Sequence, residues 1–435
     1  MSRKPSRSGQ GDFTGLWTSY TLSSLADGLI VIMLPLLALT LTSSPGLVAG
    51  LKWAQTMPYV LFTLLIGVYV DRVDRGRLIL LAHLTRVFAL GLLALAVAGD
   101  VASLTTLYAV AFLLATAELV ADLGTTAVLP AVVSQNRLDG ANSRLESTRS
   151  ALNEFVGPPL GGLLIAAGAV TATLSAAGVY LLAAGALMLL FRGRYDPRRR
   201  VGESPVENRP LREELVEGLR FLRRHRLLRN LAVMVCVMAG AWSAWSAVLV
   251  LYAVSPGPMG LSGTGYGLLL TALALGGVVG SLSAGHVRRA LGTRNLLAVD
   301  VATGVVMLGT PALTSEVWLI GPATFLGGFG GGLWNVTVVT LRQQLIPDEL
   351  LGRVSSASRL IAWGGMPLGA VMAGLLAQTA GARPVFALAS LACALLLIPF
   401  LRVIREDTIR DALAARASDR DAERTGDGQD TGKSG

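Results

Sequence analysis

Long apolar segments recur along this chain of 435 residues, and they constrain its fold more than any other feature. Each segment runs for roughly 20 residues, the length of helix that crosses a hydrocarbon core of about 30 Å. Only 15% of the residues are charged, whereas soluble proteins have about 25%. The segments lack the alternation of apolar and polar residues that β-barrel strands show. The sequence therefore predicts an all-α membrane protein.

Twelve apolar segments can be counted, and each is expected to form one transmembrane helix. They cover residues 13–41, 46–70, 78–99, 103–128, 146–168, 170–191, 230–254, 263–287, 295–313, 317–341, 355–379 and 383–403. The first segment follows a basic N-terminus, but it is too long for a signal peptide and contains Asp27. We therefore expect it to remain in the protein as the first helix.

The connections between these segments alternate in charge. Arginines gather after the even-numbered segments, at Arg72/Arg75/Arg77, Arg137/Arg144, the stretch 192–229, Arg288/Arg289/Arg294 and Arg342/Arg353. The connections after the odd-numbered segments contain no lysine or arginine, apart from Arg383 near the last one. Positive charge accumulates on the cytoplasmic side, so both termini are expected in the cytoplasm of a plasma-membrane protein. This topology accounts for the net charge of +9, and no nucleic-acid partner is inferred.

The basic stretch 192–229 divides the chain into two comparable parts. The expected domains are a six-helix half at 1–191, a cytoplasmic linker at 192–229, a second six-helix half at 230–404 and a disordered tail at 405–435. The linker is predicted to contain an amphipathic helix whose apolar stripe is formed by Leu211, Leu215, Leu219 and Leu222. Its arginines suit the anionic lipids of the inner leaflet, and a regulatory docking site is the alternative.

Short motifs repeat between the two halves. The first pair is Gly67-x3-Asp71-Arg72-x-Asp74-Arg75 and Gly285-His-Val-Arg-Arg289, and the second is Gly157-Pro158-x-x-Gly161-Gly162 and Gly365-Met-Pro-Leu-Gly369. Internal repeats in a membrane protein are typical of secondary transporters, whose substrate site lies between the repeats near the middle of the membrane.

These motifs resemble those of the major facilitator superfamily. Residues 67–77 are similar to its loop signature Gly-x3-Asp-Arg-x-Gly-Arg-x-Arg, with Asp74 in place of the second glycine. This form, together with Leu351-Gly-Arg353, resembles the branch of macrolide efflux proteins and the enterobactin exporter. The resemblance covers residues 13–404. It implies twelve helices in two pseudo-symmetric halves, alternating access by a rocker-switch movement and exchange of a drug for protons, without a cofactor.

The chain departs from the family pattern at two places. Arg144 and Asn153 stand where the antiporter motif of the fifth segment has glycines. Glu118 and Asp122 lie in the fourth segment, where many drug:proton antiporters have an arginine. The resemblance further implies a cytoplasmic gate in which Asp122 pairs with Arg75. Its expected members are Gly67, Asp71, Arg72, Asp74, Arg75, Asp122 and Arg353.

Ionisable residues in the middle of a membrane segment cost several kcal/mol unless they meet a partner or a wet cavity, so each is a functional candidate. Asp27, Glu118 and Glu154, with the neighbouring Asn153, are predicted to couple transport to protons or to bind substrate. Burial disfavours the charged form of a carboxylate, which can then take up and release a proton. The alternative for each is a fixed ion pair that locks helices together. Residues closer to segment ends rank lower, namely Lys52, His83, Arg86 and Asp300.

Two further groups complete the predicted site. Aromatic residues are expected to line a cavity suited to bulky amphiphilic molecules, namely Trp242, Trp245, Trp334 and Trp363. The fifth segment is expected to bend at a motif formed by Gly157, Pro158, Gly161 and Gly162. Lys52 is expected to extend toward the membrane surface, and His83 to be a satisfied interior polar group.

The predicted function is proton-coupled efflux of a drug-like or small metabolite molecule by a monomer surrounded by membrane lipids. A siderophore or lipid-like amphiphile is the alternative cargo, and a transport-inactive membrane sensor is a more remote alternative. No phosphate-binding loop, metal-ligand spacing or paired catalytic motif is found in the sequence, so neither a cofactor nor an enzyme activity is inferred.

Overall fold

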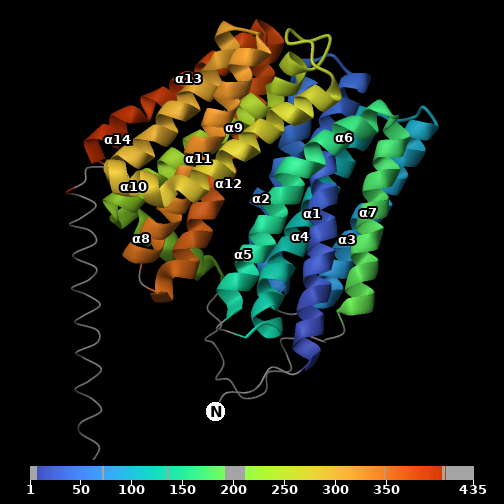
Figure 1. Ribbon diagram of the computed structural model, residues 1–435, viewed down its shortest axis with the longest axis horizontal. Helices are drawn as coiled ribbons and strands as arrows, with labels where there is room; N and C mark the ends of the chain where they lie inside the picture. Colours follow the sequence, from blue (N-terminus) through green and yellow to red (C-terminus); the bar gives the residue numbers. More distant parts are fainter. Residues whose placement is uncertain are drawn as a thin grey trace, which may run out of the picture.

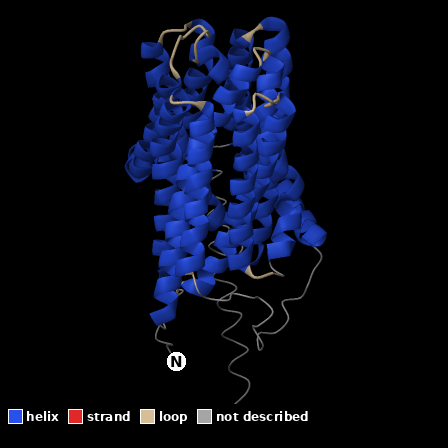
Figure 2. Cartoon of the chain, turned by 90° about the vertical axis from the view of Figure 1, so that its right-hand side faces the viewer, coloured by secondary structure: helices blue, strands red, loops and turns tan. Residues whose placement is uncertain are grey.

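The computed structural model describes residues 7–70, 73–134, 137–191, 211–346, 348–403 and 407. Every regular element within these ranges is a helix (Figures 1 and 2). The helices are α1 (Arg7–Leu41), α2 (Pro45–Val70), α3 (Arg75–Ala98), α4 (Leu104–Val132), α5 (Leu138–Arg149), η2 (Ser150–Val156), α6 (Gly157–Ala166), α7 (Ala169–Leu190), α8 (Leu211–Arg224), α9 (Arg226–Ala253), α10 (Gly263–Leu313), α11 (Val317–Leu345), α12 (Asp348–Ala380), α13 (Ala382–Leu395) and α14 (Leu397–Val403).

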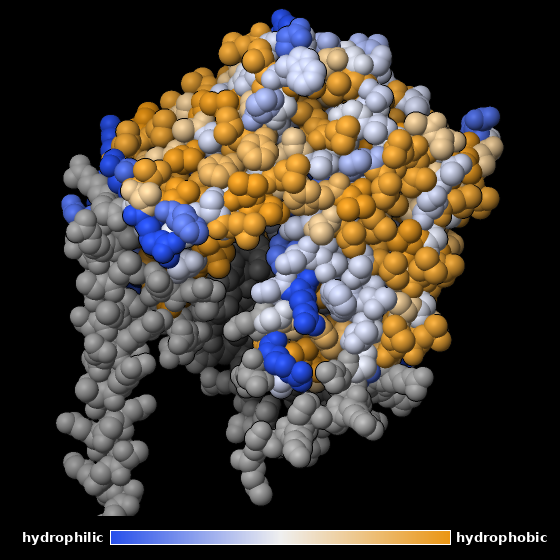
Figure 3. All heavy atoms as spheres, viewed as in Figure 1, coloured by the Kyte–Doolittle hydropathy of each residue, from blue (hydrophilic) through white to orange (hydrophobic). Residues whose placement is uncertain are grey.

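The outer surface of this bundle is apolar, which confirms an all-α membrane protein. Eight helices of the described part are long and apolar enough to cross a membrane. Large apolar side chains point outward, and Leu95, Leu189 and Trp318 are 71%, 71% and 83% exposed. Hydrophobic residues cover much of the face shown in Figure 3. Lipid chains solvate such a surface, so exposing these apolar side chains carries no free-energy penalty in a membrane.

Two connections are shorter than the sequence suggests. Gly292 has a non-helical conformation (φ 80°, ψ 165°), so α10 consists of two helices that turn at this single residue. The helix predicted to end at residue 287 therefore continues to the turn. In the other connection, α3 begins at Arg75, and Asp74 caps it because its Oδ1 accepts a hydrogen bond from the Arg77 backbone at 2.9 Å.

Helices far apart in the sequence pack together. Helix α1 contacts α6 and α7, α2 contacts both α4 and α12, and α10 contacts α6, α11 and α13. Helix α8 forms where the amphipathic helix was predicted, and it packs against α9 and α12. Leu222 is 4% exposed in the core, whereas Leu219 faces outward, so this helix is partly held by protein rather than by lipid alone. The side chains of Leu211 and Leu215, and most of the tail, lie outside the described residues.

Glycines allow α10 and α11 to approach closely, as small residues often do between helices in lipid. A methyl group on Gly276, Gly280, Gly328 or Gly332 would meet backbone atoms of the facing helix at less than van der Waals distance. Backbone atoms cannot move aside as a flexible side chain can. We conclude that this contact depends on the absence of side chains at these four positions.

Adjacent glycines of α11 provide a matched test of this contact. Gly332→Ala places its methyl group against the Gly277 carbonyl, whereas a methyl group at Gly331 meets nothing within 4 Å. We expect Gly332→Ala to lower stability by about 1–3 kcal/mol through overpacking. Gly331→Ala should keep or raise it, because alanine favours helix by roughly 1 kcal/mol over glycine. The melting temperature of the purified protein reports both changes, and equal melting temperatures would contradict the assignment.

Candidate functional site

A large cavity lies between the helices, with a volume of about 1400 Å³. Ligand pockets usually measure roughly 300–1,000 Å³, so this one can hold a drug-sized molecule with water. Helices α1, α2, α4, α9, α10, α11 and α12 and segment η2 contribute to its wall. Figure 3 shows a recess between the helices in its lower half, on the side where the N-terminus lies in Figure 1.

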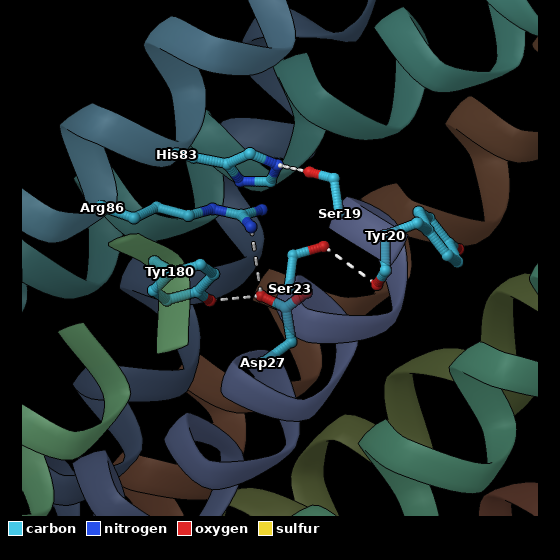
Figure 4. A network of polar contacts seen from close by, with 7 residues as sticks. All are labelled: Ser19, Tyr20, Ser23, Asp27, His83, Arg86 and Tyr180. Carbon is cyan, nitrogen blue, oxygen red and sulfur yellow. Dashed lines mark hydrogen bonds and ion pairs between the residues drawn. The ribbon is translucent and has the colours of Figure 1, made fainter. Parts of the chain in front are cut away.

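A smaller polar pocket adjoins this cavity, and Asp27 lies at the junction. Asp27, Glu118, Arg149 and Asn153 line both spaces. The Oδ1 atom of Asp27 accepts a hydrogen bond of 2.5 Å from the Tyr180 hydroxyl group and lies 3.5 Å from Nη1 of Arg86 (Figure 4). The Arg86 side chain is 2% exposed and that of Asp27 is 17% exposed. The carboxylate thus contacts a buried cation on one side and the cavity on the other.

Aromatic rings hold this ion pair in place. The guanidinium carbon of Arg86 lies 4.9 Å from the centre of the Tyr180 ring, a cation–π distance. The His83 ring stacks on Tyr180 at 6.3 Å, and its Nε2 lies 3.2 Å from the Ser19 hydroxyl oxygen. Figure 4 shows these side chains converging from α1, α3 and α7. His83 is an interior polar group as expected from the sequence, but it is only partly satisfied, because its Nδ1 atom is buried without a hydrogen-bond partner. Tyr180 is the centre of the network.

The two carboxylates of α4 face the same spaces. Glu118 and Asp122 are four residues apart and share a helix face. Asp122 lines the polar pocket, and Glu118 lines both the pocket and the cavity, where the Tyr59 hydroxyl group lies beside it. Arg75, the expected partner of Asp122, donates from Nη1 to the Ala127 carbonyl oxygen at 2.6 Å. Asp122 thus lines the polar pocket, and its pairing with Arg75 stays a prediction.

Segment η2 brings Asn153 and Glu154 to the cavity, and short π-helical segments often occur at functional sites. Arg149 binds Glu146 at 2.6 Å and lies 3.8 Å from Glu154. Glu154 therefore has a cationic neighbour, as the alternative of a fixed ion pair requires. The backbone of Asn153 packs so closely on Gly28 that a side chain there would clash. This contact fixes the π-helical segment beside Asp27.

Of the four tryptophans predicted to line the cavity, the structure places three at its wall and one in the hydrophobic core. Trp242, Trp245 and Trp363 line the cavity. Trp334 is buried in the hydrophobic core at 8% exposure, and its neighbour Asn335 lines the cavity instead. The reason is geometric, because successive residues of an α-helix point about 100° apart. Trp334 is therefore not a cavity residue.

Lys52 does not extend toward the membrane surface, so that expectation was wrong. Its Nζ atom lies 5.0 Å from the centre of the Trp242 ring, and both residues line the cavity. The aromatic face gives the ammonium group a favourable contact inside the protein, so it need not reach the surface.

The predicted gate is only partly described. Asp71, Arg72 and the side chain of Arg353 lie outside the described residues. A methyl group on Gly67 would meet nothing within 4 Å. The motif of the fifth segment is better defined, since Gly157 and Gly161 approach α1 and Gly162 approaches the start of α10. Pro158 follows Gly157 in the first turn of α6, where proline needs no backbone donor.

Sequence reasoning ranked Arg86 too low and did not single out Tyr180. Arg86 is residue 12 of the 24 in α3 (86 − 75 + 1), so it lies at mid-helix. The signal was an arginine flanked by apolar residues on both sides, which needs a buried partner in lipid. Tyr180 gave no signal, because a tyrosine in an apolar helix does not require a buried partner as an isolated charged residue does.

The comparisons with known proteins agree with this architecture. A family model described as transmembrane secretion effector matches residues 6–424. The chain belongs to the major facilitator superfamily. It is a multi-pass membrane protein of a transporter family, and its similarity to efflux proteins covers most of its length.

Two relatives and one solved structure illustrate the similarity. The multidrug efflux pump Tap of Mycolicibacterium fortuitum is 29% identical over 391 residues, which cover 87% of this chain and 93% of Tap. The enterobactin exporter EntS of Salmonella typhimurium is 28% identical over 350 residues, covering 79% and 80% respectively. A bacterial homologue of the human lysosomal transporter Spinster, inward-facing and unoccupied, has a TM-score of 0.67 at 14% identity and covers 95% of this chain and 99% of that one.

The buried pair of Asp27 and Arg86 gives a prediction about stability. Arg86→Met leaves the carboxylate without its cation, and removal of one partner from a buried pair costs on the order of 3 kcal/mol. The double variant Asp27→Asn, Arg86→Met removes both charges and should regain most of this loss. We expect the melting temperature of the purified protein to fall in the single variant and to recover in the double variant. If the double variant melts below the single one, the pair does not act as a unit.

Proposed function

We propose that this protein is a secondary active transporter that exports a drug-like molecule or a small metabolite in exchange for protons. The observation that carries the proposal is the position of Asp27, which contacts a buried arginine and also faces the large cavity. A carboxylate in that position can be reached by both a proton and a substrate. The similarity to Tap and EntS supports export as the direction.

The proposed architecture has twelve transmembrane helices in two halves, 1–191 and 230–404, joined by the cytoplasmic linker 192–229 and followed by the tail 405–435. Contacts between the halves support it. Ala49, Ala247 and Ala370 of α2, α9 and α12 form one buried cluster, and Gly46 approaches Gly374. We assign these contacts to a closed end of the cavity. We assign the opposite end, toward which the recess opens, to the cytoplasm of a cell whose plasma membrane holds the transporter as a monomer among lipids.

Coupling follows from competition for the carboxylates. In the cytoplasm-facing state, the Asp27 carboxyl group is held by Arg86 and Tyr180. Substrate enters the cavity, and the halves rock to open outward. A proton then binds Asp27 or Glu118 from outside, weakens the attraction to Arg86 and favours the return. Glu154 and Asn153 complete the polar wall, while the loop 67–77 and Arg353 latch the cytoplasmic end.

The alternative cargo is a siderophore or a lipid-like amphiphile carried on the same scaffold. The similarity to an enterobactin exporter favours it. The cavity wall also contains neutral polar groups that can bind hydroxyl-rich molecules, among them Gln55, Ser246 and Asn335. A panel of toxic compounds and siderophores, tested for accumulation in cells with and without the gene, would separate the two.

The coupling role of Asp27 can be tested in vesicles with an imposed pH gradient. We expect Asp27→Asn to abolish gradient-driven transport, because an amide cannot take up a proton. Glu316→Gln is the matched control, since Glu316 is an exposed carboxylate between α10 and α11 that does not line the cavity, so this variant should transport like the wild type. Wild-type transport by the Asp27 variant would refute the coupling role. Wild-type transport that ignores the gradient would refute proton exchange altogether.

A further inference from the structure

Lys52 occupies an unusual position for a membrane-embedded lysine. It lies in α2, and its Nζ atom sits 5.0 Å from the centre of the Trp242 ring of α9. Within the described residues no carboxylate lies within 4.0 Å of Lys52. The ammonium group therefore rests on an aromatic face and not in an ion pair.

The chemistry of this contact defines a cation site. Tryptophan has the aromatic face that binds cations best, and the contact strengthens when water is excluded. Glu118 is the acidic residue that acts on the charge of Lys52. Tyr59 lies seven residues after Lys52 on the same face of α2, and its ring packs edge-to-face on Trp363 at 4.7 Å. The Trp242 face and the charge of Glu118 thus act on a position that the Lys52 ammonium group already fills.

The charges of the cavity indicate what else this position can accept. Its wall contains four carboxylates, Asp27, Glu118, Glu146 and Glu154, against two cations, Lys52 and Arg149. Arg86 balances Asp27 from the polar pocket, and Arg149 balances Glu146. A substrate that brings its own positive charge would therefore find uncompensated carboxylate charge once Lys52 moves away.

We propose that Lys52 is a tethered occupant of a cation-binding aromatic subsite, and that a cationic amphiphilic substrate displaces its ammonium group from Trp242. This deepens the proposed function and rests on it for the identity of the cavity as the substrate site. Lys52 is accordingly a specificity-determining residue. It lowers the affinity for cations by competing with them, and it leaves neutral molecules of the same shape unaffected.

Binding to the purified full-length protein tests this competition. The probes are naphthyltrimethylammonium and its neutral tert-butyl isostere, which have the same shape and differ in charge. We expect Lys52→Met, which keeps the aliphatic stem, to lower the Kd of the cationic probe by about tenfold, the size of one cation–π contact. The Kd of the neutral probe should change by less than about twofold, because its contact is not electrostatic.

Trp242→Leu separates competition from simple charge repulsion. Without the ring, Lys52 has no face to occupy, so Lys52→Met should no longer tighten binding of the cationic probe. If it tightens binding equally in both backgrounds, Lys52 acts only through its charge and the proposal fails. Lys52→Arg provides an independent measurement, since a guanidinium group stacks more strongly on tryptophan and should weaken binding of the cationic probe.

The remaining outcomes are also decisive. An unchanged Kd in Lys52→Met, an equal change for both probes, or no binding of the cationic probe to this variant would overturn the proposal. Binding requires no proton gradient, so the assay is independent of transport. Loss of gradient-driven transport with the expected binding changes would refute the proposed function alone, and the opposite result would refute this inference alone.

Discussion

The ion pair between Asp27 and Arg86 is the constraint on which the rest of the N-terminal helices depends. Neither charge is stable alone at this depth, so α1 and α3 must lie close enough to join them. Tyr180 adds α7 to the same contact through its hydroxyl group and its ring face. One carboxylate thus fixes the positions of three helices. Any event that changes its charge acts on all three at once.

Because of this arrangement, the two sides of the cavity wall differ in the residue types that line them. Its charged residues come from α1, α2, α4, α5 and η2, whereas α9, α10, α11 and α12 contribute aromatic, apolar and glycine residues with a few neutral polar ones, namely Ser246, Ser281 and Asn335. The side formed by α9, α10, α11 and α12 is rich in glycine because α10 and α11 pack against each other through glycine residues. This part of the wall is therefore smooth and has few hydrogen-bond donors. The orientation of a substrate therefore depends on the charged side of the cavity, and its contact area depends on the side formed by α9 to α12.

The sequence predicted the helical membrane fold and the polar segments that matter, because apolar length and isolated charges are local properties. Asp27, Glu118 and Asn153 were found in this way, and all three reach the cavity. Arg86 was ranked low, since its importance depends on which helix faces it. Trp334 and Lys52 were misplaced for the same reason. Whether a side chain contacts the core, lipid or a cavity depends on how its helix is rotated about its own axis. The sequence of that helix alone does not determine this rotation.

Segment η2 shows how packing in one place determines chemistry in another. Gly157 and Gly28 allow the fifth span to touch α1, and the facing backbone leaves no room for a side chain at either position. The π-helical turn just before this contact lets Arg149, Asn153 and Glu154 face the cavity together, which regular α-helical spacing over five residues would not favour. The chain is thus π-helical at η2, where it must both pack on α1 and direct polar side chains into the cavity. The same turn also contacts α10, so one short segment joins the polar wall of the cavity to both α1 and α10.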